Sequence, residues 1–376
     1  MQEKTFNYKI ADAQGTYVAP IAPEQFDIEG YCAYEADLLD KCRIFWEKKN
    51  GVAVYRRFRV PEVFSYGSKD LKTSLALQLA ALQESMKYKA DIPNFLEPWY
   101  GIGTVVSAFG LNYEWHDNQA PATRTPFKSI EEVLQAEQKP VEETEIGRHT
   151  LEMIEYFLDK TKGKIPMSFT DTQSPLNIAS ALVDINSFFL EIYDNPEGVK
   201  ELFGIITKLL IDFTKKQHTY IGDALASPGH GFSSSRAFQG LGMSDDIMLM
   251  LSDAIYEEFA LPYAEQVGAN FGGTAFHSCG NWTRKIPVVK NYKNLVMADG
   301  AFSQETDPDA NLPDLFSEAY KGTGAVLNAR IVGNAERVAE QVKKLWRPDM
   351  KLIVATYCDT PEEQEKAYER IHEICR

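Results

Sequence analysis

Apolar residues recur at helical spacing in several long segments of the chain. The clearest segment opens at Asn195-Pro196, where Asn suits the N-cap of a helix and Pro suits its first turn. Its apolar positions share one face of a helix, and they are Val199, Leu202, Phe203, Ile206, Leu209, Leu210 and Phe213. Related patterns predict a helix over 245–267 and a last amphipathic helix that begins at Thr360.

Short runs of strand-forming residues lie between these helices. We expect eight strands, over 52–58, 101–106, 165–170, 231–235, 272–277, 294–298, 324–329 and 351–356. From residue 165 onward the strands alternate with helices, which predicts right-handed βαβ units and a parallel sheet.

Eight such strands predict an α/β fold of the closed (β/α)₈ TIM-barrel type. In this interpretation residues 1–50 form an N-terminal extension and residues 51–376 form the barrel domain. The polar stretch 107–128 is expected to be a long surface loop, and Ser129 with Glu132 has the spacing of a helix capping box after it. A doubly wound open sheet is the alternative.

Composition narrows the class of partners and the compartment. The 376 residues include 39 Lys and Arg against 54 Asp and Glu, a formal net charge of −15, which argues against nucleic acid or an anionic membrane as a partner. No apolar run is long enough for a membrane span, and the N-terminus lacks the apolar run of a signal peptide. We therefore expect a cytoplasmic protein whose five cysteines are reduced.

Three residues at predicted strand ends are candidate metal ligands. His277 and Cys279 close the fifth predicted strand, and Cys358 closes the eighth. In a barrel both strand ends open on the same face, so one imidazole and two thiolates would meet in a set that suits zinc with one open position. The alternative is that both cysteines are buried as small apolar residues. His230 precedes a predicted strand, so we expect it to pack or lie at the surface.

Other polar residues follow predicted strands and would line the same mouth. Asp171 and Gln173 follow the third strand, Asp299 and Gln304 follow the sixth, and Arg330 closes the seventh. We interpret Asp171 and Arg330 as candidate catalytic residues, because Arg330 suits a substrate carboxylate or phosphate. Gln173, Asp299 and Gln304 are candidate cofactor-binding residues. The alternatives are that Asp171 caps the next helix and that Arg330 forms a structural ion pair.

At these positions the sequence resembles the uroporphyrinogen decarboxylase superfamily, over roughly 90–376. The stretch 171–176 is similar to the family's Gly-Pro strand-to-helix turn, with Ser174 in place of Gly. The stretch 194–199 is similar to the family's NPE segment, and 258–263 is similar to its EFxLPY helix. The resemblance implies a (β/α)₈ barrel with the active site at its C-terminal mouth.

Two chemistries occur in that superfamily. Its decarboxylases carry an arginine-rich MRQAGR signature and a C-terminal Gly-His-Gly. In this sequence Arg56-Arg57-Phe58 is only weakly similar to the MRQAGR signature. Tyr357-Cys358-Asp359 occupies the place of the Gly-His-Gly. No arginine cluster for a polyanionic substrate is evident. Its other branch, methyltransferases that move methyl groups between a corrinoid and a thiol, shares a His-x-Cys…Cys zinc motif that His277, Cys279 and Cys358 match.

The resemblance therefore implies a zinc-dependent methyltransferase that acts on a small-molecule thiol. It also implies a corrinoid methyl donor carried on a separate corrinoid protein, and a homodimer. A further acidic or amide metal ligand is common in the family, and Asp171, Asp299 and Gln304 are candidates for it. The alternatives are a tetrapyrrole decarboxylase that needs no metal and a barrel that binds a corrinoid or tetrapyrrole without turnover.

Overall fold

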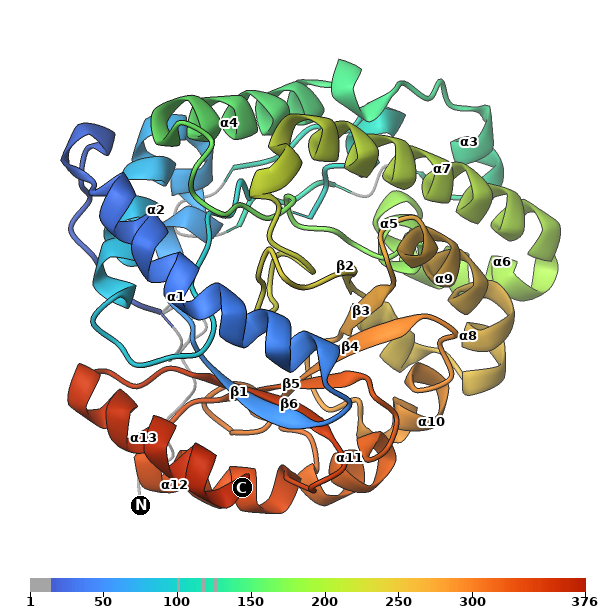
Figure 1. Cartoon of the computed structure of the whole chain (residues 1–376). Coiled ribbons are helices and arrows are strands. Elements are labelled where there is room, and N and C mark those ends of the chain that lie inside the picture. The colour runs from blue at the N-terminus through green and yellow to red at the C-terminus, as the bar shows by residue number, and fades with distance from the viewer. Residues whose placement is uncertain (1–14, 100–101, 116–119, 125–126) are drawn as a thin grey trace, which may run out of the picture.

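A six-stranded, all-parallel sheet forms the centre of the molecule (Figure 1). The computed structural model describes residues 15–99, 102–115, 120–124 and 127–376. In this part of the chain the strand order is β1-β6-β5-β4-β3-β2. The strands are β1 (Gly51–Arg56), β2 (Leu241–Ser244), β3 (Thr274–His277), β4 (Leu295–Ala301), β5 (Val326–Ile331) and β6 (Lys351–Thr356). The α/β class predicted from the sequence is confirmed.

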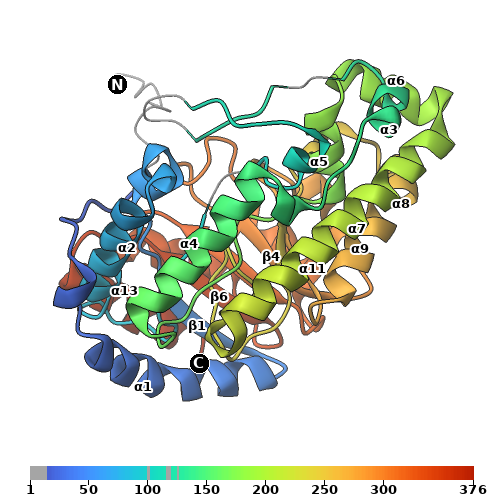
Figure 2. The same cartoon turned by 90° about the horizontal axis from the view of Figure 1, so that it is seen from above.

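Helices surround this sheet (Figure 2). In the first half of the chain they are α1 (Ile28–Glu47), α2 (Leu71–Ser85), α3 (Ile130–Gln135), α4 (Glu145–Thr161), α5 (Pro175–Leu182), α6 (Ile185–Asp194) and α7 (Pro196–Ile221). In the second half they are α8 (Asp253–Phe259), α9 (Leu261–Ala269), α10 (Ile286–Val289), α11 (Pro313–Tyr320), α12 (Ala335–Leu345) and α13 (Pro361–Ile374).

The predicted helices are found, with one division. Asn195 caps α7 by accepting a hydrogen bond from the Gly198 amide at 3.2 Å, and Thr360 caps α13. The single helix expected over 245–267 is instead a 3₁₀ helix over Asp246–Met250 followed by α8 and α9. Helix α8 does not run on into α9, because Pro262 lacks the amide hydrogen that would continue it. Ser129 accepts a hydrogen bond from the Glu132 amide, as the capping box predicts.

Five of the eight predicted strands are present as β1, β3, β4, β5 and β6. The segment 165–170 contributes only isolated parallel bridges, from Met167 to Leu96 and to Leu225. The described part of 101–106 forms turns, and 231–235 is a loop, so the prediction of strands there is wrong. Strand β2 was not predicted, because its four residues include Gly242 and lack an apolar run. The six strands do not close on themselves.

Residues of the sheet alternate between two buried clusters. Val54, Leu327 and Leu352 belong to the main cluster, which holds most buried residues of the surrounding helices. Ala53 and Ile353 belong to a second cluster that includes Cys42 and Phe45 of α1, among others. Helix α1 thus packs on the sheet, while the division into an extension over 1–50 and a domain over 51–376 stays a prediction.

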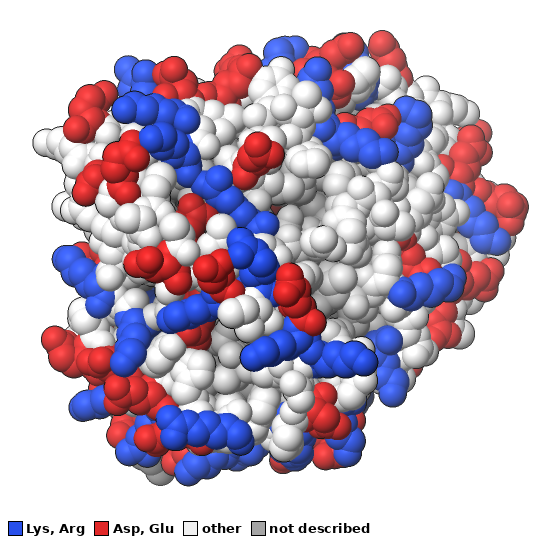
Figure 3. Space-filling view, in the orientation of Figure 1, with Lys and Arg blue, Asp and Glu red and all other residues white. Residues whose placement is uncertain are grey.

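Charges of both signs are mixed on the face that α1 crosses (Figure 3). The net charge of −15 is therefore not gathered into one acidic patch on that face. Within the described residues, none of the helices is both long enough and apolar enough to cross a membrane.

Candidate functional site

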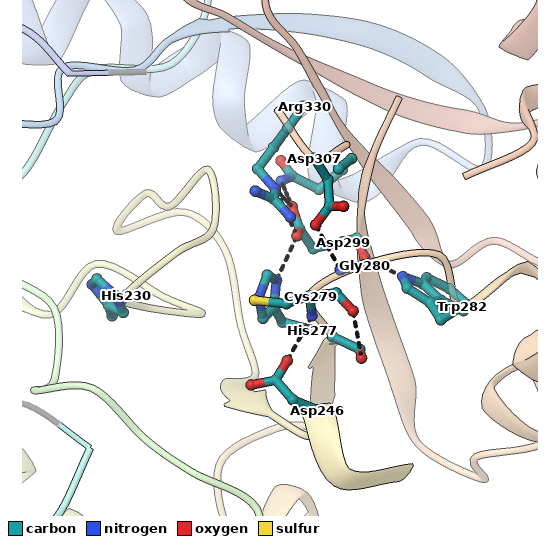
Figure 4. A network of polar contacts seen from close by, with 12 residues as sticks. His230, Asp246, His277, Cys279, Gly280, Trp282, Asp299, Asp307 and Arg330 are labelled. Carbon is teal, nitrogen blue, oxygen red and sulfur yellow. Dashed lines mark hydrogen bonds and ion pairs between the residues drawn. The ribbon is translucent and has the colours of Figure 1, made fainter. Parts of the chain in front are cut away.

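His277 is the last residue of β3 and anchors a buried polar network (Figure 4). Its register partner on β4 is Asp299, and Nδ1 of His277 lies 2.6 Å from Oδ2 of Asp299. Asp299 is fully buried and also accepts hydrogen bonds from Nε of Arg330 at 2.9 Å and from Nδ2 of Asn328 at 2.6 Å. Because the carboxylate occupies Nδ1, the Nε2 atom of His277 is the ring nitrogen left for a ligand.

Three potential metal ligands converge beside this ring. Sγ of Cys279 lies 3.4 Å from Nε2 of His277, and Asp246 follows β2 on the adjacent chain segment. One ligand atom from each of Asp246, His277 and Cys279 lies within 4.8 Å of the other two. The Cys279 amide donates to Oδ1 of Asp246 at 2.6 Å, which fixes the carboxylate. Imidazole, thiolate and carboxylate are donors that zinc binds, so these residues fit a zinc ion.

Electrostatics of the network favour a charged Asp299 and a strongly held proton on His277. Burial raises the pKa of Asp299, but Arg330 and His277 outweigh it and hold that pKa below its usual range. Burial lowers the pKa of His277, whereas Cys279 and Asp299 raise it, and the result is a pKa of about 10. A metal ion at Nε2 would replace that proton and keep the hydrogen bond to Asp299.

Cys358 is not brought to this group. It follows β6, is buried, and packs in a small cluster with Ala335 and Ala367. Its Sγ contacts the carbonyl oxygen of Gly333 at 3.9 Å, and burial raises the pKa of its thiol to about 11. The structure thus joins His277 and Cys279, whereas the role of Cys358 as a ligand stays a prediction.

A pocket of about 510 Å³ opens above the three converging side chains. Asp171, Gln173 and Arg330, which the sequence singled out, line it. Asp299 lies beneath Arg330 and supports the lining from within the protein. Gln304 is exposed and is not among the residues that line this pocket. Three of the five candidates for catalysis or cofactor contact therefore share one cavity with His277 and Cys279.

Sequence reasoning missed several residues of this pocket. Asp246 was missed because the strand before it was not predicted. His230 was expected to pack or lie at the surface, because a strand was placed after it, yet it lines the pocket. Asp307 also lines the pocket, and its Oδ2 accepts a hydrogen bond from the Gly280 amide at 2.8 Å. The sequence signal for Asp307 was its position after β4, which Gln304 shared.

The expectation that no arginines cluster here is wrong. Arg57 and Arg59 follow β1, and Arg330 lies on β5. All three line the pocket, although they come from distant parts of the sequence. They were not recognised as a set because only the parallel arrangement of β1 and β5 around β6 brings them to one edge.

Comparison with known proteins identifies the family of this chain. Residues 98–367, more than two thirds of the chain, match the family model described as uroporphyrinogen decarboxylase (URO-D). The chain belongs to the uroporphyrinogen decarboxylase family. No curated protein matches the sequence. Among solved structures, a methyltransferase from Methanosarcina mazei is similar with a TM-score of 0.60 and 16% identity, over 90% of this chain and 98% of that one.

Membership in the family confirms the resemblance noted in the sequence. At 16% identity the likeness to the archaeal methyltransferase concerns the fold. The reaction must therefore be argued from the residues of the pocket.

Proposed function

We propose that the protein is a zinc-dependent methyltransferase that moves a methyl group between a corrinoid and a small thiol. The observation that carries this proposal is the convergence of Asp246, His277 and Cys279 in the lining of the pocket. Three protein ligands leave a fourth position open, which is the arrangement of a catalytic zinc rather than a structural one.

When bound, zinc would supply a Lewis acid that lowers the pKa of a substrate thiol and keeps the sulfur nucleophilic. The residues of the chain set up that chemistry. Asp299 fixes the ring of His277 so that Nε2 points to Cys279. The Cys279 amide orients Asp246, and Arg330, while paired with Asp299, presents its remaining guanidinium surface to the pocket.

The methyl donor is proposed to arrive on a separate corrinoid protein. The fold proposed for residues 51–376 is a (β/α)₈ barrel. The parallel bridge Gln173–Ser244 supports it, because it continues the pairing beyond the edge strand β2. The parallel bridges Leu96–Met167 and Met167–Leu225 support it too, because they join three further segments side by side. A corrinoid protein would then dock over the mouth of the barrel, where the pocket opens. A homodimer stays part of the proposal.

The arginines of the pocket favour a second candidate function. Arg57, Arg59 and Arg330 line the cavity and would suit the carboxylates of a tetrapyrrole, as decarboxylation of such a substrate requires. The zinc proposal accounts for Cys279, whereas the decarboxylase proposal gives this thiol no task. Cys279 therefore separates the two candidates.

The test uses the full-length protein, loaded with zinc and incubated with methylcobalamin and a panel of small thiols. We expect about one zinc per chain and formation of the methylated thiol. Cys279→Ala should lose zinc and methyl transfer together. Cys32→Ala removes a thiol that lies outside the pocket and should change neither. Decarboxylation of uroporphyrinogen that persists with a chelator and in C279A would overturn the proposal.

A further inference from the structure

A second group of polar side chains stands in the same pocket, away from the metal ligands. His230 lies across an open space from Cys279 and His277 (Figure 4). We propose that Asp171, His230 and Glu97 form a proton relay that takes the proton released by the substrate thiol. This inference rests on the proposed function, and it assigns residues that the metal site does not use.

The backbone of the loop that carries His230 directs its side chain into the pocket. Gly229 and Gly231 flank the histidine with φ of +120° and +84°, a backbone conformation that residues with a Cβ rarely adopt. The hydroxyl of Ser234 accepts a hydrogen bond from the Gly229 amide at 2.9 Å and donates one to the Gly229 carbonyl at 3.1 Å. The turn is therefore closed on itself, and the imidazole extends from it into the pocket.

Glu97 holds the imidazole from behind. Its Oε1 lies 2.8 Å from Nδ1 of His230, and a carboxylate can only accept, so Nδ1 carries the proton. Gln78 clamps the Glu97 backbone by accepting from its amide at 2.6 Å and donating to its carbonyl at 2.9 Å. The rings of Phe64 and Trp99 flank the imidazole at centroid distances of 5.2 and 6.2 Å. Nε2 of His230 thus remains as the basic atom.

Asp171 connects this base to the rest of the cavity. Its Oδ1 lies 4.0 Å from Nε2 of His230, and its Oδ2 accepts from Gln173 at 2.8 Å. One bridging water or a small shift of the side chain closes the 4.0 Å gap. Burial raises the pKa of Asp171 and outweighs His230 and Gln173, which lower it, so the carboxylate accepts a proton more readily than an exposed one.

The charges around the relay allow it to hold an extra proton. Burial raises the pKa of Glu97, but His230 and Arg57 outweigh it, so Glu97 stays ionised. The charged groups that face His230 are Glu97 and Asp171, with Arg57 and Arg59 acting on Glu97. An imidazolium at position 230 would therefore lie between two carboxylates.

The proton balance of the reaction requires a proton acceptor, and the relay supplies one. The S–H bond of the thiol breaks and its proton passes to Asp171 and on to Nε2 of His230. The S–CH₃ bond forms while the methyl–cobalt bond of the corrinoid breaks, and that bonding electron pair stays on the corrinoid. His230 then releases the proton to water, which restores the relay.

Single-turnover methyl transfer from methylcobalamin, measured between pH 5 and 9, tests the kinetic role. His230→Gln keeps a donor for Glu97 but carries no titratable nitrogen, and should slow transfer by about 100-fold or more and remove the acid limb of the profile. In Glu97→Gln a neutral amide replaces the carboxylate behind the imidazole, so transfer should be slower than in the wild type. Bound zinc should remain about one per chain in both variants.

His372→Gln is the matched control. Nε2 of His372 pairs with the buried Asp91 at 2.8 Å outside the pocket, so this variant also replaces a histidine that faces a buried carboxylate. If H230Q and H372Q have the same rate and the same pH profile, the relay is wrong and the methyltransferase proposal stands. If the wild type transfers no methyl group, the proposed function fails. The relay is then tested by ¹⁵N NMR of the His230 ring. A neutral His230 that carries its proton on Nε2 overturns the relay, and one that carries it on Nδ1 supports the relay.

Discussion

Nδ1 of His277 lies 2.6 Å from Oδ2 of Asp299, a carboxylate with no exposure to solvent. Asp299 is the register partner of His277 on the neighbouring strand, so the sheet itself sets the contact. Arg330 and Asn328 hold the carboxylate from β5. The orientation of the candidate ligand is therefore decided by three adjacent strands.

Asp299→Asn tests that orientation. Its amide cannot carry the charge that fixes His277, so zinc affinity should fall by about 10- to 100-fold. Competition with a chromophoric chelator measures the change. Asn281→Asp is the control: it makes the reverse amide-to-carboxylate change at a residue outside the pocket lining, and it should leave the zinc affinity unchanged. Equal zinc affinity of D299N and the wild type would show that Asp299 does not orient the ligand.

Asp246→Asn and Cys358→Ser separate two possible ligand sets. The geometry predicts that D246N loses most of the zinc and that C358S retains it, because the Cys358 thiol contacts Gly333 instead. Elemental analysis of the two variants, purified side by side, gives the answer. Loss of zinc in C358S with retention in D246N would mean that the sequence motif, with a rearranged Cys358, forms the site.

Burial of Lys351 should make the folding stability of the protein depend on pH. Burial lowers the pKa of this lysine to about 8, while its ammonium group donates to the Trp46 carbonyl at 2.7 Å. Between pH values of about 8 and 10.5, the ordinary lysine pKa, Lys351 keeps its proton in the unfolded chain but has lost it in the folded chain. The free energy of unfolding therefore rises with pH in this range.

Lys351→Met lacks this titration. The melting temperature of the wild type minus that of K351M should therefore be larger at pH 10 than at pH 7. Thermal unfolding of both proteins at the two pH values measures it, and the other titrating groups cancel in the difference. A constant or smaller difference at pH 10 would show that burial does not perturb this lysine.

Gly273 precedes β3 and supports the position of His277. It has φ of +132°, and a Cβ there would lie 2.4 Å from Cγ1 of Val296. Gly163 has φ of +64°, and a Cβ there would meet no heavy atom within 4 Å, so it isolates the backbone effect. Gly273→Ala should destabilise the protein by about 2 kcal/mol more than Gly163→Ala. Equal losses in denaturant unfolding would contradict this packing.

The sequence predicted the site where ligands lie close together in the chain. His277 and Cys279 are two residues apart at the end of an apolar strand, so their convergence followed from one local pattern. Asp246 was not predicted, because β2 is only four residues long and the six-strand order alone places its end beside β3. His230 was not predicted either, because its role depends on Glu97, which lies 133 positions away.

Cys358 shows a different limit. Its place after the last strand was predicted correctly, since β6 ends at Thr356. The direction of its side chain depends on packing with Ala335 and Ala367, which no local pattern encodes. The arginines of the pocket are a similar case, because Arg57 and Arg330 share a cavity through strand order rather than through spacing.

Zinc X-ray absorption of the loaded, substrate-free protein tests the central claim most directly. A centre formed by Asp246, His277 and Cys279 predicts one sulfur at about 2.3 Å, with the remaining nitrogen and oxygen ligands at about 2.0–2.2 Å. Cys279→Ala should remove the sulfur contribution. A wild-type spectrum with no sulfur, or a protein that binds no zinc, would contradict the account.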